Sequence, residues 1–498
     1  MGTFNLVFQD NNSLLTSLSS ETSSLYPALL ALIVVSSTIV INSSINSAKN
    51  GSKNGCPPKA PTGLFETIKL LSGSNFPWFL LQTAKELNSS IFRFSKLEYL
   101  FGCPMVVVVG EAQTALKILK DPQSTKPMAI YGPLREMFLG VGSIFVSNGS
   151  YWHSRRKGVS PAFSSRHVKR MNEVAIEKAD EWINGRLTTL IENDEAFDVG
   201  EEMIGITFSA IAKTAFQYDV SDEENKTYTQ ELALAFKEFF FKSATNPLRK
   251  PLGLFFSERR RAHRASQWLT SFNLNLIDRY RKLDNPVKDT IIDRIMKNDA
   301  YKNDLERAAD VGVLIIAGHD TTAYSMAFTL KELAKHPEEM QKLQQSLSEH
   351  STENFDKSHV LRNVMKEAMR LHPVLPLGST RTLGKDIETN EGYMLPKGSV
   401  AFMPFILNQR DPKVFKDPDV FNPSRWENPT NEMNEAFYPF SSGKQNCVGQ
   451  SLANAEMYSV VARICSAFDL ELVEEGKTEY FVTMKPYKTM IKAHRRSS

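Results

Sequence analysis

The sequence predicts one mainly helical domain with small β-sheets, which follows a single membrane-spanning helix. Most of the chain after Leu64 has apolar residues at helical spacing, and the longest such stretch, Asn303–Lys335, is charged at both ends and apolar in its middle. Only short runs such as Pro104–Gly110 (PMVVVVG) have the β-branched character of strands. No internal repeat or low-complexity linker divides residues 64–498, so one domain is expected there in spite of its length.

The membrane-spanning helix is predicted from length and charge. Residues 25–41 (LYPALLALIVVSSTIVI) contain no charged side chain and are 17 residues long, at the short end of what crosses a bilayer as a helix. Only Asp10 and Glu21 are charged before this segment, whereas lysines follow from Lys49 onward. Because positive charge remains on the cytosolic side, residues 1–24 are expected to form a lumenal tail and the rest of the protein to lie in the cytosol.

Two other roles of the N-terminal segment stay open on the sequence alone. A cleaved signal peptide would need a basic segment at its start, and no lysine or arginine precedes Lys49. The same lack of basic residues excludes a mitochondrial presequence, but the many serines leave a plastid address open. A Gly/Ser/Pro-rich linker is expected at residues 42–63, between the anchor and the domain at 64–498.

Composition narrows the class of protein. The 498 residues are 42% hydrophobic and 23% charged, as expected for a globular protein with a large core. The formal net charge of +3 gives no reason to expect a nucleic-acid partner. The four cysteines are widely separated and none forms a CxxC pair, so neither a zinc site nor a disulfide framework is predicted.

Polar residues interrupt the apolar middle of the predicted long helix. The segment Ala317–Thr322 (AGHDTT) places Asp320 beside Thr321 and a second threonine. A buried carboxylate is costly unless it is paired or functional, threonine hydroxyls can open the helical hydrogen-bond ladder to a water, and Gly318 lets another group approach the backbone. The alternative is a locally satisfied kink in a core helix, in which His319 only packs.

Two arginine-bearing motifs follow in the second half of the chain. Glu367 and Arg370 are three residues apart on a predicted helix and can form an ion pair. An exposed pair that stabilises little is the simpler alternative. Arg425 lies in the loop FNPSRW, and Arg381 lies among short predicted strands.

A third motif lies nearer the N-terminus. Within Asn148–Phe163, Trp152 and Arg156 are one helical turn apart, so an indole and a guanidinium can grasp one anionic group together. The alternative is an ordinary basic amphipathic helix.

Cys447 lies in a glycine-framed loop, Phe440–Gly449 (FSSGKQNCVG), close to the C-terminus. One thiolate cannot complete a zinc site or an iron–sulfur cluster, but it is a soft ligand that can be the single protein ligand of a haem iron. Gly443 and Gly449 would let the backbone turn tightly and approach a macrocycle. The helix predicted after Gly449 would direct its positive end toward the sulfur.

Together these motifs resemble those of the cytochrome P450 family, the haem-thiolate monooxygenases, from Leu64 to the C-terminus. The family patterns are F-x-x-G-x-R-x-C-x-G, E-x-x-R, an arginine-bearing loop, A-G-x-D-T-T and W-x-x-x-R, and they occur here in the family's order and spacing. The matching residues are Phe440, Gly443, Cys447 and Gly449; Glu367 and Arg370; Phe421, Pro423, Arg425 and Trp426; Ala317–Thr322; and Trp152 and Arg156.

The resemblance implies a chemical role for several of these residues. Cys447 would be the axial thiolate of haem b (iron protoporphyrin IX), in a loop shaped by Phe440, Gly443 and Gly449. Asp320 and Thr321 would deliver protons during the activation of dioxygen. The supporting roles are a buried structural triad of Glu367, Arg370 and Arg425, and contacts to the haem propionates from Trp152, Arg156 and Arg381.

Two positions depart from patterns within the family. The cysteine-loop pattern has an arginine two residues before the cysteine, where this chain has Gln445. An uncharged amide there is expected to weaken haem retention, since a hydrogen bond to a charged group is worth about 1.5–3 kcal/mol, unless Lys444 or Arg381 compensates. Ala317 stands where some fatty-acid hydroxylases of the family carry a glutamate that bonds covalently to haem, so no such crosslink is expected.

The resemblance also implies a reaction and partners. The protein would insert one oxygen atom of O₂ into a lipophilic substrate such as a fatty acid, sterol, terpenoid or carotenoid, with electrons from NADPH through the flavin-containing cytochrome P450 reductase, at the endoplasmic reticulum membrane. Lys444, Arg155 and Lys157 would form the docking patch for the reductase. The apolar segments Tyr131–Phe145 and Phe236–Phe256 would cap the substrate pocket, and Arg249 and Lys250 within the second would lie at lipid headgroups.

Two alternative functions remain on the sequence. One is a haem-thiolate isomerase or dehydratase that rearranges a hydroperoxide without O₂ or reductase, although such an enzyme has no need for Asp320 and Thr321. The other is a non-catalytic membrane protein that binds haem or lipid, which only Gln445 favours.

Overall fold

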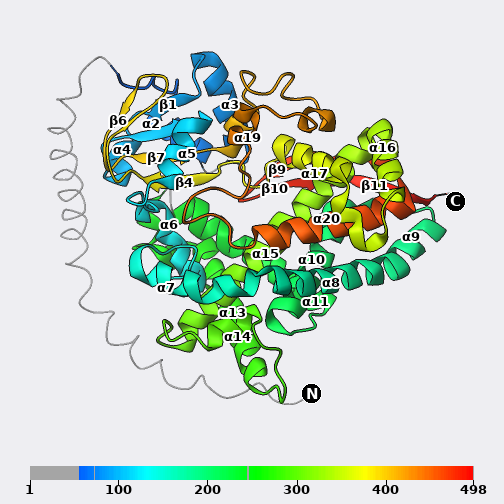
Figure 1. Ribbon diagram of the computed structural model, residues 1–498. Helices are drawn as coiled ribbons and strands as arrows, with labels where there is room; N and C mark the ends of the chain where they lie inside the picture. Colours follow the sequence, from blue (N-terminus) through cyan, green and yellow to red (C-terminus); the bar gives the residue numbers. More distant parts are fainter. Residues whose placement is uncertain (1–54, 72, 244–245, 497–498) are drawn as a thin grey trace.

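The computed structural model describes residues 55–71, 73–243 and 246–496 (Figure 1). The predicted lumenal tail at 1–24, the predicted anchor at 25–41 and most of the linker lie outside these residues, so the boundaries there stay predictions. Within the described ranges, no helix combines the length and apolar character needed to cross a bilayer.

The described chain is mainly helical, as predicted. The helices are α2 (Leu64–Leu71), α3 (Phe76–Leu87), α4 (Leu97–Phe101), α5 (Ala112–Lys120), α6 (Met128–Tyr131), α7 (Gly149–Val159), α8 (Ser165–Trp182), α9 (Thr188–Glu192), α10 (Val199–Phe216), α11 (Asp222–Phe236), α13 (Ser257–Arg281), α14 (Ile291–Met296), α15 (Asp304–Lys335), α16 (Pro337–Ser348), α17 (His359–Leu371), α18 (Phe405–Asn408), α19 (Asn431–Ala436) and α20 (Gln450–Ala467). Short 3₁₀ and π segments are η1 (Pro133–Phe138), η2 (Ser160–Phe163), η3 (Ile183–Leu187), η4 (Lys237–Lys242), η5 (Pro247–Arg249), η6 (Gly253–Phe255), η7 (Thr352–Lys357) and η8 (Pro423–Trp426).

The strands are short and form small sheets. They are β1 (Ile91–Phe94), β2 (Val106–Val109), β3 (Phe197–Asp198), β4 (Ser379–Thr382), β5 (Ile387–Glu388), β6 (Met394–Leu395), β7 (Val400–Met403), β8 (Phe468–Glu474), β9 (Lys477–Tyr480), β10 (Met484–Tyr487) and β11 (Met490–Arg495). The largest sheet has the order β1-β2-β7-β4, and its β2–β7 pair is parallel. The sheet thus joins β2, the strand predicted within Pro104–Gly110, and its partner β1 to strands some 290 residues later, and β4 carries Arg381.

The helix α15 is the axis of the fold. It begins one residue after the predicted start, where the side chain of Asn303 accepts a hydrogen bond from the Glu306 amide at 3.0 Å, and ends before the His336–Pro337 pair. Its 32 residues span about 48 Å. Helices α10, α13, α17 and α20 all pack against it, and it remains one continuous helix through Ala317–Thr322 (Figure 1).

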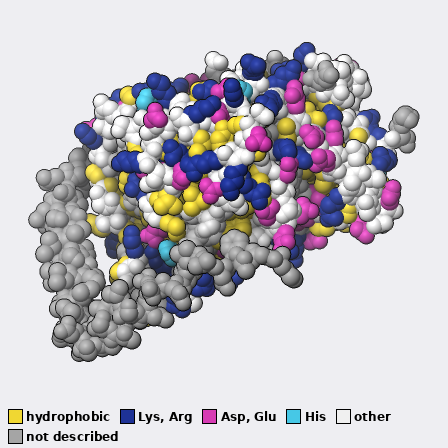
Figure 2. Space-filling view, turned by 90° about the horizontal axis from the view of Figure 1, so that it is seen from below, with side chains coloured by type: hydrophobic (Ala, Val, Ile, Leu, Met, Phe, Trp, Pro, Cys, Tyr) yellow, Lys and Arg dark blue, Asp and Glu magenta, His cyan; other side chains and the backbone are white. Residues whose placement is uncertain are grey.

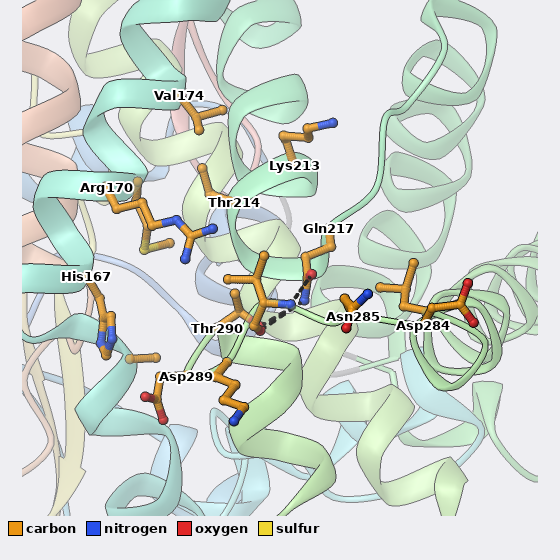
Figure 3. Close-up of a pocket in the computed structure, with 15 residues that line it drawn as sticks. His167, Arg170, Val174, Lys213, Thr214, Gln217, Asp284, Asn285, Asp289 and Thr290 are labelled. Atoms are coloured by element: carbon orange, nitrogen blue, oxygen red, sulfur yellow. Dashed lines mark hydrogen bonds between the residues drawn. The ribbon is translucent and has the colours of Figure 1, made fainter.

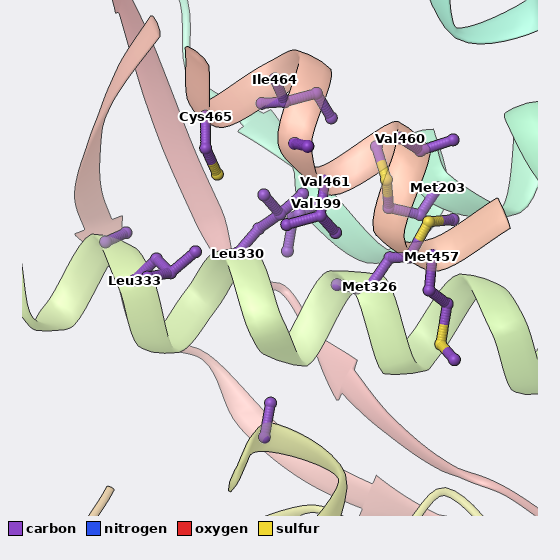
Figure 4. Packing of buried hydrophobic residues seen from close by; sticks show 14 of the residues in the cluster. Val199, Met203, Met326, Leu330, Leu333, Met457, Val460, Val461, Ile464 and Cys465 are labelled. Atoms are coloured by element: carbon purple, nitrogen blue, oxygen red, sulfur yellow. The ribbon is translucent and has the colours of Figure 1, made fainter. Parts of the chain in front are cut away.

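Two apolar clusters enclose α15 from different sides. In the first, Met326, Leu330 and Leu333 of α15 pack against α20 (Figure 4). In the second, Leu314 and Ile315 pack with apolar residues of α10 and α13. Fully burying one such side chain is worth about 1.5–3 kcal/mol. The helix that follows Cys447 is therefore fixed directly to the helix that carries Asp320.

The surface is charged but balanced. Figure 2 shows one face, on which basic and acidic side chains are interleaved and hydrophobic side chains gather between them. No single charge dominates that face, in agreement with the near-neutral net charge of +3.

Candidate active site

The loop that carries Cys447 closes on itself. The Cys447 amide donates to the carbonyl oxygen of Phe440 at 2.9 Å, and the Asn446 amide donates to the carbonyl oxygen of Gly443 at 3.2 Å. Ser441 has φ of 63°, a left-handed conformation that is uncommon for residues other than glycine. The loop is therefore a tight turn with its own hydrogen bonds, and it presents the cysteine at a defined place.

Glycine occupies positions 443 and 449 of this loop for different structural reasons. Gly443 has φ of 75°, and a Cβ atom there would lie 2.1 Å from the carbonyl oxygen of Leu119, so glycine is required for the approach of α5. Gly449 has φ of −87°, and a Cβ atom would lie 3.9 Å from the sulfur of Cys447. Glycine at this position leaves the surface beside the sulfur clear.

The surroundings of Cys447 act on its thiol in opposite directions. Burial by the surrounding protein raises the pKa of Cys447 above its ordinary value, whereas the Gly449 amide and the Arg156 guanidinium lower it. The cysteine is nevertheless exposed to solvent, so a ligand can reach this residue. The first turn of α20 begins directly after Gly449, and its positive end favours a negative sulfur.

Glu367, Arg370 and Arg425 come together in the core. Arg370 donates from Nε and Nη2 to the two carboxylate oxygens of Glu367, each at 2.9 Å, and Arg425 donates from Nε to Glu367 Oε1 at 2.9 Å. Glu367 and Arg370 are fully buried. Arg370 also donates to the carbonyl oxygens of Gln409 and Pro418 at 2.9 and 2.7 Å. The buried pair on α17 thus organises the long segment that precedes the cysteine loop.

Trp426 links this triad to the cysteine loop. Its indole N–H donates to Glu367 Oε2 at 2.9 Å, and its ring lies 4.8 Å from the ring of Phe437. From there the chain enters the loop, where Tyr438 accepts a hydrogen bond from Asn408. The sequence motif contained Trp426, but its hydrogen bond to the triad was not predicted.

Three predicted anion-binding residues lie on α7 and β4. Arg156 donates to the carbonyl and side-chain oxygens of Asn446 at 2.8 and 3.0 Å, which fixes α7 against the cysteine loop. Arg381 is 4% exposed and donates to the carbonyl oxygen of Thr380 at 2.9 Å. Within the described residues, no carboxylate forms an ion pair with either guanidinium. Trp152 lies one turn before Arg156 on the same helix and is partly buried.

The middle of α15 opens on one side only. Ala317 is exposed and Thr321 is partly exposed, although His319 and Thr322 beside them are buried. The Thr321 hydroxyl donates to the carbonyl oxygen of Ala317 at 2.9 Å. Asp320 is partly exposed, with Oδ1 2.8 Å from Nδ1 of His319. Asp320 and Thr321 are therefore accessible on one face of α15, and the helical hydrogen-bond ladder stays closed there.

Gly318 and His319 have packing roles. A Cβ atom on Gly318 would lie 3.1 Å from the side chain of Ile211, so the group that approaches this glycine is helix α10. His319 is fully buried and its ring lies 5.1 Å from that of Phe208 in an edge-to-face arrangement. The alternative of a packing histidine is the one that the structure shows.

The residues around Cys447 fit a haem. An accessible thiol is the right donor for a single axial ligand, and the guanidinium groups of Arg156 and Arg381 supply positive charge that no carboxylate of the described chain pairs with. Guanidinium groups bind carboxylates with strong, charge-assisted hydrogen bonds. A thiol that can bind iron, together with guanidinium groups that can bind carboxylates, suits haem, which has an iron and two carboxylates.

Comparison with known proteins decides the family. The family model for cytochrome P450 matches residues 59–493. This chain belongs to the cytochrome P450 family. Members are haem-iron monooxygenases, and the predicted domain type and enzyme class are thereby confirmed.

Curated relatives cover most of this cytochrome P450. It is 27% identical to the probable cytochrome P450 4p3 of Drosophila melanogaster over 449 residues, which are 82% of this chain and 84% of the relative. It is 26% identical to cytochrome P450 4A6 of Oryctolagus cuniculus over 382 residues, 70% of this chain and 72% of the relative. It is 27% identical to cytochrome P450 4F6 of Rattus norvegicus over 371 residues, 68% of each chain.

The predicted surface role of Arg155 is wrong. Arg155 is fully buried, 2.6 Å from Glu306 and 3.5 Å from Asp310, and its guanidinium lies 3.7 Å from the centre of the Tyr151 ring. These contacts fix α7 to the first turns of α15. Of the proposed docking patch in this cytochrome P450, Lys157 and Lys444 are exposed, and Arg155 cannot belong to it.

The predicted headgroup contact of Arg249 is also wrong. Arg249 is buried and donates to both carboxylate oxygens of Glu238 at 2.9 and 2.7 Å. Lys250 is exposed and lies 3.3 Å from Glu136 of η1. The acidic partner of Arg249 lies 11 residues earlier, within the same predicted segment Phe236–Phe256.

A groove on another part of this cytochrome P450 contains none of the predicted site residues. Its volume is about 350 Å³, and it lies between α8, α10 and the loop before α14 (Figure 3). Gln217 crosses it, accepting from the Val287 amide at 2.7 Å and donating to Thr290 Oγ1 at 3.3 Å. These bonds hold the loop to the end of α10.

Proposed function

We propose that this cytochrome P450 inserts one oxygen atom of O₂ into a lipophilic substrate, with electrons from NADPH passed on by the cytochrome P450 reductase. The observation that supports it is the combination of an accessible thiol, Cys447, with an accessible Asp320–Thr321 pair on α15. Because α20 packs along α15, the thiol loop and the proton-handling pair belong to one rigid centre.

Haem b held by Cys447 would supply the activation of dioxygen, aided by electron density from the thiolate. The protein's own residues would hold the cofactor, keep the cysteine loop in place and move protons. Trp152, Arg156 and Arg381 hold the carboxylates of the cofactor, and the Glu367 triad keeps the cysteine loop in place.

Asp320 and Thr321 handle protons. The Asp320 carboxylate is partly exposed and can exchange a proton with water. The Thr321 hydroxyl donates a hydrogen bond to the Ala317 carbonyl oxygen at 2.9 Å, so its lone pairs remain to accept a hydrogen bond from a water. A carboxylate and a hydroxyl at successive positions can thus pass a proton to a group that lies against this face of α15.

The substrate is proposed to be apolar. The segment Tyr131–Phe145 presents aromatic surface. The ring centres of its first and last residues lie 5.5 Å apart, and Phe145 is 49% exposed. Such surface binds fatty acids, sterols, terpenoids or carotenoids through burial of apolar area. The segment Ala317–Thr322 resembles the version found in fatty-acid hydroxylases of the family, which favours a fatty acid.

A membrane location fits this substrate. Phe255 is 73% exposed, and Leu248 and Leu252 near it are exposed as well, so this end of the domain can enter the interface of a bilayer. With the anchor predicted at 25–41, we place the protein in the endoplasmic reticulum membrane with its domain in the cytosol. Lys157 and Lys444 are the cations proposed to meet the acidic surface of the reductase.

The experiment that tests this function uses the purified full-length protein with lipids and reductase. Its reduced form should give the carbon monoxide difference band of a haem thiolate, and NADPH consumption should rise with a fatty acid and yield the hydroxylated acid. Matched panels of fatty acids, sterols, terpenoids and carotenoids identify the class by spectral shift. Conversion of a lipid hydroperoxide without reductase, together with no NADPH-dependent product, would contradict the proposal.

Asp320→Asn should separate electron use from product formation. Asparagine keeps the shape but cannot deliver a proton, and positioned acid–base groups contribute about 10²–10⁴-fold to rates. We expect product formation to fall roughly tenfold to a hundredfold, since Thr321 and water remain, while haem content and the carbon monoxide band stay unchanged. Product per NADPH measures the effect, and the exposed Asp284→Asn is the control. An unchanged product-to-NADPH ratio would exclude a proton-handling role.

A further inference from the structure

Lys126 is a buried cation without an ionic partner. It is 8% exposed, and its ammonium group donates to the carbonyl oxygen of Ile144 at 3.3 Å and lies 5.7 Å from the centre of the Phe145 ring. No carboxylate forms an ion pair with it among the described residues. Lysine is almost never fully buried unless it is paired, so this position suggests an anionic partner outside the polypeptide.

The backbone holds Lys126 between the two elements that carry Arg381 and Arg156. Thr125, the preceding residue, exchanges both backbone hydrogen bonds with Thr382 at 3.1 and 2.7 Å, directly after Arg381 in β4. The side chain of Asn148, the N-cap of α7, accepts from the Lys126 amide at 3.0 Å and donates to its carbonyl oxygen at 2.9 Å. Four hydrogen bonds therefore hold the backbone of Thr125 and Lys126 between β4 and the start of α7.

The three cations are close enough to affect one another. Burial, Arg381 and Arg156 together lower the pKa of Lys126 to about 7, against an opposing effect of Asp310. Asp310 is already engaged, because it accepts from the Ile144 amide at 2.6 Å and from the Tyr301 hydroxyl at 2.7 Å. Clustered, buried and unpaired positive charges are stabilised when a dianionic group lies among them.

Gln445 shares an anchor with Lys126. The Gln445 amide nitrogen lies 3.5 Å from Oδ1 of Asn148, the side chain that holds the Lys126 backbone. Its buried Oε1 has no hydrogen-bond partner. Asn148 therefore links Lys126 to Gln445, the position at which the family pattern has arginine. Lys444, in contrast, is exposed.

We infer that Lys126 is a third cation at the carboxylate edge of the haem and supplies the positive charge that Gln445 does not. The inference rests on the proposed haem-thiolate function. It replaces the earlier expectation that Lys444 compensates, because Lys444 is exposed and its charge is screened by water. Arg156, Arg381 and Lys126 then bind the two propionates from α7, β4 and the segment before α6.

The test measures haem retention, not turnover. Haem transfer from the full-length protein to excess apomyoglobin gives a first-order loss rate. We expect Lys126→Met to lose haem about tenfold faster than the wild type, because one charge-assisted hydrogen bond is removed, and Lys126→Arg to remain near the wild type. Lys444→Met is the matched surface control and should not change the rate. Gln445→Arg in the Lys126→Met background should restore retention.

A second measurement keeps the inference falsifiable if Lys126→Met folds poorly. The wild type and Lys126→Gln are reconstituted with haem and with haem dimethyl ester, which lacks both carboxylate charges. The preference for haem over the ester should shrink about tenfold in the variant. An equal preference in both proteins would overturn the inference.

One other outcome is decisive. If Lys126→Met keeps haem like the wild type but binds a fatty acid more weakly, with no change for the corresponding fatty alcohol, Lys126 meets the carboxylate of the substrate and the inference is wrong. If no protein in the series, the wild type included, shows the carbon monoxide band of a haem thiolate, it is the proposed function that fails.

Discussion

Cys447→Ser is expected to abolish monooxygenase turnover while the polypeptide stays folded. The loop is held by the hydrogen bond from the residue 447 amide to Phe440 and by Gly443 against α5, and neither involves the sulfur. Serine should therefore adopt the same backbone. Its hydroxyl does not ionise near neutral pH and is a hard, weak ligand for haem iron, so the electron density that favours O–O cleavage is lost.

The measurement has two parts. The reduced carbon monoxide difference band should lose its thiolate position, and NADPH-dependent product should fall below detection, while far-ultraviolet circular dichroism remains that of the parent. Cys56→Ser changes an exposed cysteine far from the loop in sequence and serves as the control. A serine variant that keeps both the band and the product would show that residue 447 is not the iron ligand.

The sequence predicted those parts of the site that local motifs specify. The cysteine loop, the Glu367–Arg370 pair and the long helix could be placed because short-range spacing and turn chemistry determine them. The same reasoning identified Gly318 as special but not why, since its neighbour Ile211 comes from a helix about a hundred residues earlier. Arg155 was placed on the surface because its partner Glu306 is 151 residues away.

Lys126 shows where such reasoning stops. A lone lysine between Thr125 and Pro127, with Pro122 shortly before it, has the sequence signature of a surface loop. Its burial depends on the meeting of α7, β4 and the segment before α6, and no property of the sequence around residue 126 reports that meeting. Buried charge is a property of tertiary packing, so it has to be read from the fold.

Glu367→Gln is expected to have the largest effect on stability. The carboxylate accepts hydrogen bonds from both arginines, from the Trp426 indole and from the Asn422 amide, each at 2.9 Å. A glutamine has one acceptor oxygen and turns an NH₂ group toward two guanidinium ions. Breaking a buried pair by removing one partner costs about 3–5 kcal/mol, because the remaining charge is left uncompensated.

Urea titration followed at the haem absorbance measures this cost. The midpoint of haem loss should fall by the equivalent of about 3–5 kcal/mol, whereas Glu388→Gln, an exposed carboxylate on β5, should change the free energy by no more than about 0.5 kcal/mol. Glu367→Asp keeps the charge, so its midpoint should lie between those of Glu367→Gln and Glu388→Gln. It is the variant to measure if Glu367→Gln does not accumulate. Coinciding midpoints for the wild type and Glu367→Gln would exclude a supporting role.

Glu367 and Asp320 should affect different quantities, namely haem retention and turnover per haem. The hydrogen bonds of Glu367 go to its own helix and to the segment before the cysteine loop, and none within the described residues goes to α15. The fraction of Glu367→Gln that retains haem should therefore turn over at the parent rate per haem. Asp320→Asn should do the opposite, with full haem retention and slow turnover. A triad variant that kept its haem but slowed the reaction would mean that Glu367 acts on the reacting centre itself, which its hydrogen bonds do not predict.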